Sequence, residues 1–187
     1  MTAALHVLLV RHGRTALNAE GRLRGLANPE LDETGVAQVA ATAAALRPLH
    51  LTEVHSSPLH RAVTTAEIIA RESGVTNQVD PAFNDRDYGP WTGKIKSEVI
   101  AEWGSVDAAP GVEDSTIVRD RALAALDALV RAAASGPIAV VTHDAVIRPI
   151  LKWIQPGIEA EVETASWADI AWDGQRWDVV SVDNTAE

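Results

Sequence analysis

The sequence contains no cysteine, and this absence excludes several kinds of chemistry at once. Without thiols the chain forms no disulfide scaffold, carries no thiolate nucleophile and offers no thiolate ligand to a metal. Long apolar runs are missing too, since none approaches the roughly 20 residues that a membrane helix needs. Met1 to Leu5 lead into an apolar segment and show no signal-peptide pattern. We therefore expect a cytoplasmic protein without a membrane partner.

Positive charge is also scarce. The chain has 16 lysines and arginines against 26 aspartates and glutamates, which gives a net charge of −10. This excess of negative charge argues against a nucleic-acid partner. Some of the few basic residues nevertheless lie close together near the N-terminus, at Arg11, Arg14, Arg22 and Arg24. Such a cluster in an acidic chain is typical of an anion-binding segment.

The pattern of apolar residues predicts an α/β fold. A length of 187 residues with 47% hydrophobic residues suits a single domain over residues 1–187. Strands are predicted at residues 7–10, 54–56, 78–80 and 138–142, with a terminal hairpin at 167–172 and 177–182. Helical periodicity covers residues 36–46, 58–73, 95–103, 118–133 and 145–154. We therefore predict a three-layer α/β/α sandwich with a mostly parallel central sheet.

Local signals also predict where some elements begin and end. Ser57 is expected to cap the second helix, with Pro58 at its first helical position. Asp144 is expected to cap the helix that follows residue 144, and Pro149 predicts a kink in that helix or a late start. Residues 183–187 are predicted to form a loose tail.

Two of the predicted strands end on a histidine. His12 follows the first apolar run and His143 follows the run at residues 138–142. Arg61 lies in the first turn of a predicted helix, and neighbouring strands would bring all three side chains to one edge of the sheet. A phosphoryl group is bound well by planar arginine donors, and a neutral imidazole is an unhindered nucleophile. The pattern therefore predicts a phosphate site, with Arg11 beside His12.

Several ordered motifs resemble one family. The segment Arg11-His12-Gly13-Arg14-Thr15 resembles the opening signature of the histidine phosphatase superfamily, the phosphoglycerate mutase-like group. Residues 56–66 resemble the second block of that family, residues 141–144 its last block, and residues 110–113 a further element. The resemblance covers roughly residues 5 to 150. It implies the phosphoglycerate mutase-like fold.

The resemblance also implies a mechanism. His12 attacks the phosphorus atom and forms a phosphohistidine, while Arg11, Arg61 and His143 hold the phosphoryl oxygens. Water then displaces the phosphoryl group. This reaction needs neither a metal nor another cofactor.

Four further residues take supporting roles by the same resemblance. Asn18 would add a side-chain donor to the phosphate, although a loop asparagine can instead bond to its own backbone. The backbone around Arg24 and Gly25 would line the entrance. Lys96 falls where the sugar-phosphate mutases carry a lysine for the substrate carboxylate, although such a lysine is more often a solvated helix residue.

The general acid is the point where the sequence departs from the family. The position of the expected glutamate holds Asp85, whose side chain is one methylene shorter. Asp87 and Glu113 are the alternative acids, and Asp87 also fits a surface carboxylate paired with Arg86. Asp144 stands where glycine is usual; besides capping a helix, it could orient the proton of the leaving group.

The same motifs allow more than one function. The mutases have a long insertion with two adjacent arginines, whereas residues 104–115 contain no basic residue. We therefore predict a metal-independent phosphomonoester hydrolase that acts on a small phosphorylated metabolite. A cofactor-dependent mutase is the alternative, as is a weakened regulatory protein that binds a phosphorylated ligand. The substrate is left open, and both a monomer and a homo-oligomer fit the sequence.

Overall fold

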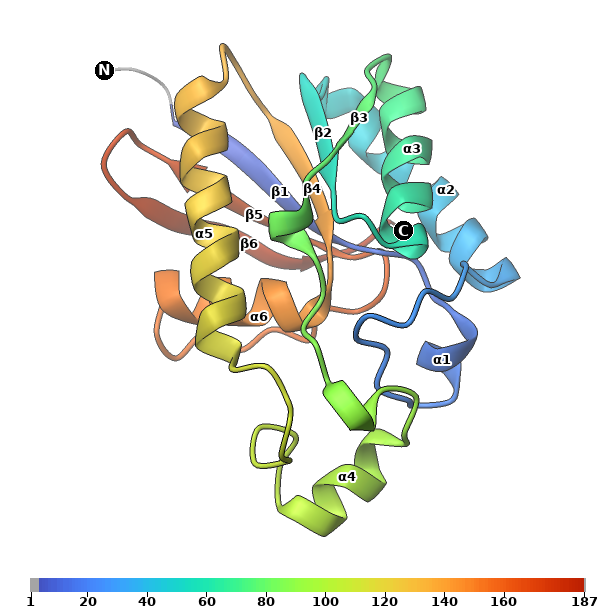
Figure 1. Cartoon of the computed structure of the whole chain (residues 1–187). Helices are drawn as coiled ribbons and strands as arrows, with labels where there is room; N and C mark the ends of the chain where they lie inside the picture. The colour runs from blue at the N-terminus through green and yellow to red at the C-terminus, as the bar shows by residue number, and fades with distance from the viewer. Residues whose placement is uncertain (1–3, 187) are drawn as a thin grey trace.

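The computed structural model describes residues 4–186. Its centre is a six-stranded sheet with the strand order β3-β2-β4-β1-β5-β6 (Figure 1). The strands are β1 (Leu5–Arg11), β2 (Glu53–Ser56), β3 (Asn77–Val79), β4 (Ile138–Thr142), β5 (Trp167–Trp172) and β6 (Trp177–Asn184). The first four run parallel, whereas β5 and β6 pair in the antiparallel direction. The predicted mostly parallel sheet is confirmed.

Helices cover both faces of this sheet and form the two outer layers (Figure 1). On one face lie α2 (Glu33–Leu46) and α3 (His60–Ser73), and on the other α5 (Ser115–Ala132) and α6 (Asp144–Ile154). The short α1 (Ala16–Ala19) and α4 (Lys96–Trp103) lie beyond the end of the sheet where β1 and β4 finish. The described residues also include three short 3-10 helices: η1 (Arg47–Leu49), η2 (Pro81–Phe83) and η3 (Gly89–Trp91). Across residues 4–186, no helix has both the length and the apolar character needed to cross a bilayer.

The apolar run of β1 supplies both faces of the core. Val7 and Leu9 pack in the cluster beneath α5 and α6, while Leu8 and Val10 pack in the cluster beneath α2 and α3. Because side chains alternate along a strand, a strand buried on both faces is apolar at every position. This explains why the first strand shows no polar alternation.

The predicted starts of two helices are wrong. Helix α3 begins at His60 and has Leu59 at its N-cap, because the Ser57 hydroxyl binds another part of the chain. Helix α6 has His143 at its N-cap and begins at Asp144, so Asp144 does not cap it. The late start predicted from Pro149 does not occur, since the helix includes this proline.

The C-terminal strand is longer than predicted. Strand β6 continues to Asn184, so two residues of the predicted loose tail belong to the sheet. The carboxylate of Asp183 accepts hydrogen bonds from the backbone N–H groups of Glu161 and Val162. These contacts tie the end of the strand to a distant loop. Glu187, the last residue of the predicted tail, lies outside the described residues.

Gly35, in the first turn of α2, packs against the backbone that follows β1. A Cβ atom here would lie 2.1 Å from the carbonyl oxygen of Arg14. Because the clash is with backbone, α2 or the loop after His12 would have to move. We expect Gly35→Ala to lower the free energy of unfolding by about 3 kcal/mol in urea denaturation.

Gly74 provides the control for this prediction. It ends α3 at a φ of 72°, and no described residue lies within 4 Å of an added Cβ. Gly74→Ala should therefore cost only about 1 kcal/mol, from the left-handed backbone conformation. Equal losses in the two variants would contradict a steric origin.

Candidate active site

The two strand-end histidines lie side by side. Strands β1 and β4 are neighbours in the sheet, with Arg11 in register with Thr142. His12 and His143 are therefore adjacent, with ring centroids 5.2 Å apart and no exposed surface. This is the convergence that the sequence predicted.

The imidazole of His12 is held in one orientation. Its Nδ1 lies 2.7 Å from the carbonyl oxygen of Gly13, so Nδ1 carries the proton and Nε2 keeps a lone pair. Within residues 4–186, the buried Nε2 has no hydrogen-bond partner. Burial lowers the pKa of His12 well below its ordinary value, and His143, Arg61 and Arg11 lower it further. The side chain is therefore neutral and has one free nucleophilic nitrogen.

Arg61 reaches the same place from α3 and is fully buried. Its guanidinium donates hydrogen bonds to the carbonyl oxygens of Ala27, at 2.7 Å, and Gly25, at 2.8 Å. It also donates to Oδ2 of Asp85 at 2.9 Å. Gly25 thus contributes the carbonyl oxygen that holds Arg61, and its φ of 49° is in the left-handed region that favours glycine.

Arg11 and Asn18, two further predicted phosphate ligands, bond to other parts of the chain: Arg11 to a distant loop and Asn18 to its own turn. Nη1 of Arg11 donates to the carbonyl oxygen of Val162 at 2.7 Å, and its buried Nε has no partner among the described residues. Oδ1 of Asn18 accepts from the backbone N–H and the hydroxyl of Thr15, which caps α1. Asn18 therefore makes the local backbone bond that the sequence left open, and it also lines the cavity described below.

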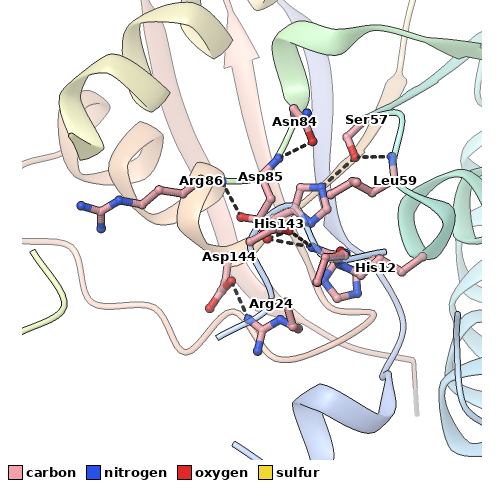
Figure 2. Close-up of polar contacts among 12 residues, drawn as sticks. His12, Arg24, Ser57, Leu59, Asn84, Asp85, Arg86, His143 and Asp144 are labelled. Atoms are coloured by element: carbon pink, nitrogen blue, oxygen red, sulfur yellow. Dashed lines mark hydrogen bonds and ion pairs between the residues drawn. The ribbon is translucent and has the colours of Figure 1, made fainter. Parts of the chain in front are cut away.

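His143 lies between Ser57 and Asp85, and within residues 4–186 its ring is hydrogen-bonded on the Ser57 side alone (Figure 2). Its Nε2 lies 2.7 Å from Oγ of Ser57, and its Nδ1 lies 3.5 Å from Oδ2 of Asp85. Burial is the main cause that lowers the pKa of His143 well below its ordinary value, followed by the charge of Arg61. The ring is therefore neutral, like that of His12.

Asp85 is the carboxylate that contacts these groups. It is buried, and besides Arg61 it accepts a hydrogen bond from the backbone N–H of Arg86 at 2.8 Å. Burial raises the pKa of Asp85 to about 6, against the opposing effect of Arg61. A carboxyl group tuned in this way can hold a proton near neutral pH and donate it.

The carboxylates of the two alternative acids, Asp87 and Glu113, are hydrogen-bonded to loop backbone. Glu113 accepts the backbone N–H of Asp87, and the carboxylate of Asp87 accepts the backbone N–H of Gly89. The predicted pairing of Asp87 with Arg86 is wrong, because Arg86 pairs with Asp107 at 2.6 Å. The loop turns the Asp87 side chain back onto its own backbone.

A cavity of about 360 Å³ opens beside the buried groups. Its basic lining residues are Arg11, Arg14, Arg22, Arg24, Lys96 and Arg148. In the wall of this cavity, Arg24 donates a hydrogen bond to the carboxylate of Asp144 at 3.2 Å (Figure 2). Burial opposes ionisation of Asp144, but Arg11 and Arg24 outweigh it and hold the pKa of this carboxyl below its usual range. Asp144 is thus a charged partner of Arg24 rather than a helix cap.

Sequence reasoning missed three residues around this site. Ser57 binds His143, and Tyr88 and Arg148 line the cavity. The signal for Ser57 was its position directly after β2, at the sheet edge where the two histidines also lie. Arg148 follows the last family block in the sequence, but no role was predicted for it, and Tyr88 had no signal because loop packing brings it to the cavity.

Comparison with known proteins agrees with this geometry. The profile of the histidine phosphatase superfamily (branch 1) matches residues 7–185, and the chain belongs to this superfamily. It is 30% identical to phosphoglycerate mutase-like protein 4 of Arabidopsis thaliana, over 92% of this chain and 82% of the relative. It is also 28% identical to the metal-independent phosphoserine phosphatase of the same plant, over 94% and 82%.

Solved structures share the fold over nearly the whole length. The phosphoglycerate mutase of Bacillus anthracis superposes with a TM-score of 0.89 at 22% identity, over 97% of this chain and 93% of that one. A mycobacterial glucosyl-3-phosphoglycerate phosphatase bound to VO3 gives a TM-score of 0.88 at 23% identity, over 97% and 100%. The expected phosphoglycerate mutase-like fold is confirmed.

Proposed function

We propose that this protein is a metal-independent phosphomonoester hydrolase with His12 as its nucleophile. The observation that carries the proposal is the state of Nε2 of His12, which is buried, neutral and unpartnered within residues 4–186. The guanidinium groups of Arg11 and Arg61 and the imidazole of His143 lie around it. Such a set of donors matches a phosphoryl group. The substrate would be a small phosphorylated metabolite.

The proposed reaction has two steps. Nε2 of His12 attacks the phosphorus atom, the bond to the leaving oxygen breaks, and Asp85 gives that oxygen a proton. Arg11, Arg61 and His143 donate hydrogen bonds to the phosphoryl oxygens throughout. Asp85 then takes a proton from water, and the resulting hydroxide displaces the phosphoryl group. The products are inorganic phosphate and neutral His12.

One assay separates this proposal from its alternatives. The purified protein is incubated with p-nitrophenyl phosphate and, separately, with 3-phosphoglycerate. Release of phosphate that vanadate inhibits is the expected result, and it should persist after treatment with EDTA. Isomerisation of 3-phosphoglycerate without net release would favour the mutase. Binding of either compound without turnover would favour the regulatory protein.

The cavity also favours a substrate with a second anionic group. Lys96 lines both the 360 Å³ cavity and a neighbouring one of about 270 Å³, which is lined also by Arg148 and Lys152. One relative is named a phosphoserine phosphatase, so O-phosphoserine is a suitable probe. Its carboxylate could pair with these basic side chains, whereas the ring of p-nitrophenyl phosphate could not.

We expect Lys96→Ala to raise KM for O-phosphoserine about two- to fivefold, the range for one exposed charge contact. Neither kcat nor the KM for p-nitrophenyl phosphate should change. Lys94→Ala is the matched control, because Lys94 is exposed nearby and lines neither cavity. The same rise in KM for both substrates, or in both variants, would contradict a role in binding the second anion.

A further inference from the structure

The hydroxyl of Ser57 contacts His143 and takes no part in the two steps of the proposed reaction. It follows β2 directly, is fully buried, and places Oγ 2.7 Å from Nε2 of His143 (Figure 2). Its backbone N–H donates to the carbonyl oxygen of Val141, in the strand that leads to His143. The serine and the histidine are therefore fixed to each other through two neighbouring strands.

We propose that Ser57 is a positioning residue that sets the tautomer of His143. In this arrangement the hydroxyl donates its proton to Nε2, so the single proton of the neutral ring stays on Nδ1. Nδ1 then presents an N–H group toward the buried charged groups of the site. The inference rests on the proposed function, because it assigns to this N–H the task of binding a phosphoryl oxygen.

The neighbours of Ser57 decide the direction of its hydrogen bond. The backbone N–H of Leu59 points at Oγ from 3.4 Å and occupies one of its lone pairs. Among the hydrogen bonds of residues 4–186, Nε2 of His143 is the acceptor available to the hydroxyl proton. On the other side of the ring, Oδ2 of Asp85 lies 3.5 Å from Nδ1. A carboxylate oxygen at that position favours a proton on Nδ1 over a lone pair.

The choice of tautomer matters because the ring is neutral and closed off from water. Its pKa lies well below the ordinary value, so the ring has one proton to place. With that proton on Nε2, a lone pair on Nδ1 would face the negative oxygens of the phosphoryl group. Burial leaves no solvent to compensate such a repulsion. A single hydroxyl therefore decides whether His143 attracts or repels the group that it should bind.

Nitrogen-15 NMR of protein labelled in its histidines tests the tautomer directly. His143→Asn identifies the resonances of this ring by their loss. In the wild type we expect the shift of a protonated nitrogen for Nδ1 and of an unprotonated nitrogen for Nε2. In Ser57→Ala the ring should populate both tautomers, and Ser57→Thr, which keeps the hydroxyl, should restore the original one. Ser56→Ala is the matched control, because Ser56 is equally buried but contacts Asn77.

Kinetics complete the test. Ser57→Ala should lower kcat for p-nitrophenyl phosphate and weaken inhibition by vanadate, each about tenfold, the size of one lost hydrogen bond to a charged group. Ser57→Thr should recover most of both values, and Ser56→Ala should change neither. An unchanged His143 tautomer in Ser57→Ala would overturn the inference even if the enzyme is active. Absence of any turnover in the wild type would instead overturn the proposed function, and the NMR result would still decide the role of Ser57.

Discussion

Replacing His12 with alanine should reduce phosphate release by at least about a thousandfold, because the variant lacks the atom that accepts the phosphoryl group in the proposed reaction. Nε2 of His12 is buried and has no hydrogen-bond partner within residues 4–186, and it keeps a lone pair because the carbonyl oxygen of Gly13 holds Nδ1. The measurement is the rate of p-nitrophenyl phosphate hydrolysis at saturating substrate. Brief reaction with a ³²P-labelled phosphomonoester, followed by denaturation, should label the wild type and leave His12→Ala unlabelled.

A second histidine controls for general effects of the substitution. His60 is exposed at the start of α3, next to Arg61 in sequence. His60→Ala should retain wild-type turnover and labelling. His12→Asn should be inactive while unfolding at a similar urea concentration to the wild type. Full turnover in His12→Ala, or a label that persists in it, would end the proposal of a His12 nucleophile.

Replacing Asp85 with asparagine should slow turnover by roughly a hundredfold or more, the range for loss of a general acid. The loss should be larger for O-phosphoserine than for p-nitrophenyl phosphate, because an alkoxide leaves poorly without a proton whereas nitrophenolate needs little help. Affinity for vanadate should be largely kept. The substitution removes the ion pair between Arg61 and Asp85, so the guanidinium of Arg61 stays available to bind the anion. Steady-state kinetics with both substrates provide the measurement.

The pH dependence of kcat/KM is a second test of Asp85 as the general acid. The pKa of Asp85 is raised to about 6 by burial, so the fraction of enzyme that holds the acidic proton falls as the pH rises through this value. The kcat/KM of the wild type should therefore decline above about pH 6, and this decline should be absent from Asp85→Asn. Asp87→Asn should behave like the wild type, because Asp87 is exposed and its carboxylate contacts Gly89. An unchanged rate in Asp85→Asn would assign the acid to another carboxylate.

Short-range patterns in the sequence were enough to predict the layers of the fold. Strands β1 and β4 are apolar at nearly every position because helices cover both faces of the sheet, and a continuous apolar run shows this without any knowledge of partners. The positions of His12 and His143 follow from the same runs, since each residue comes directly after a strand. Their closeness could be predicted because parallel strands finish at one edge.

The roles of Ser57 and Asp144 depend on contacts between residues that are far apart in the sequence. Ser57 and His143 are 86 positions apart, and Arg24 and Asp144 are 120 apart. Both Ser57 and Asp144 carry the side chains that usually cap helices, so local reasoning assigned them that role. Such a hydroxyl or carboxylate can bind either its own helix or a distant residue. Which of the two it binds depends on which partner the fold brings within reach.

The sequence by itself determined which side chains meet at the end of the sheet, because strand order and chain direction carry them there. Only the tertiary structure decided their chemical states. Burial makes His12 and His143 neutral and raises the pKa of Asp85, and burial is a property of the packed chain. The pairing of Asp85 with Arg61 likewise depends on a loop and a helix that are packed together, which no local pattern records.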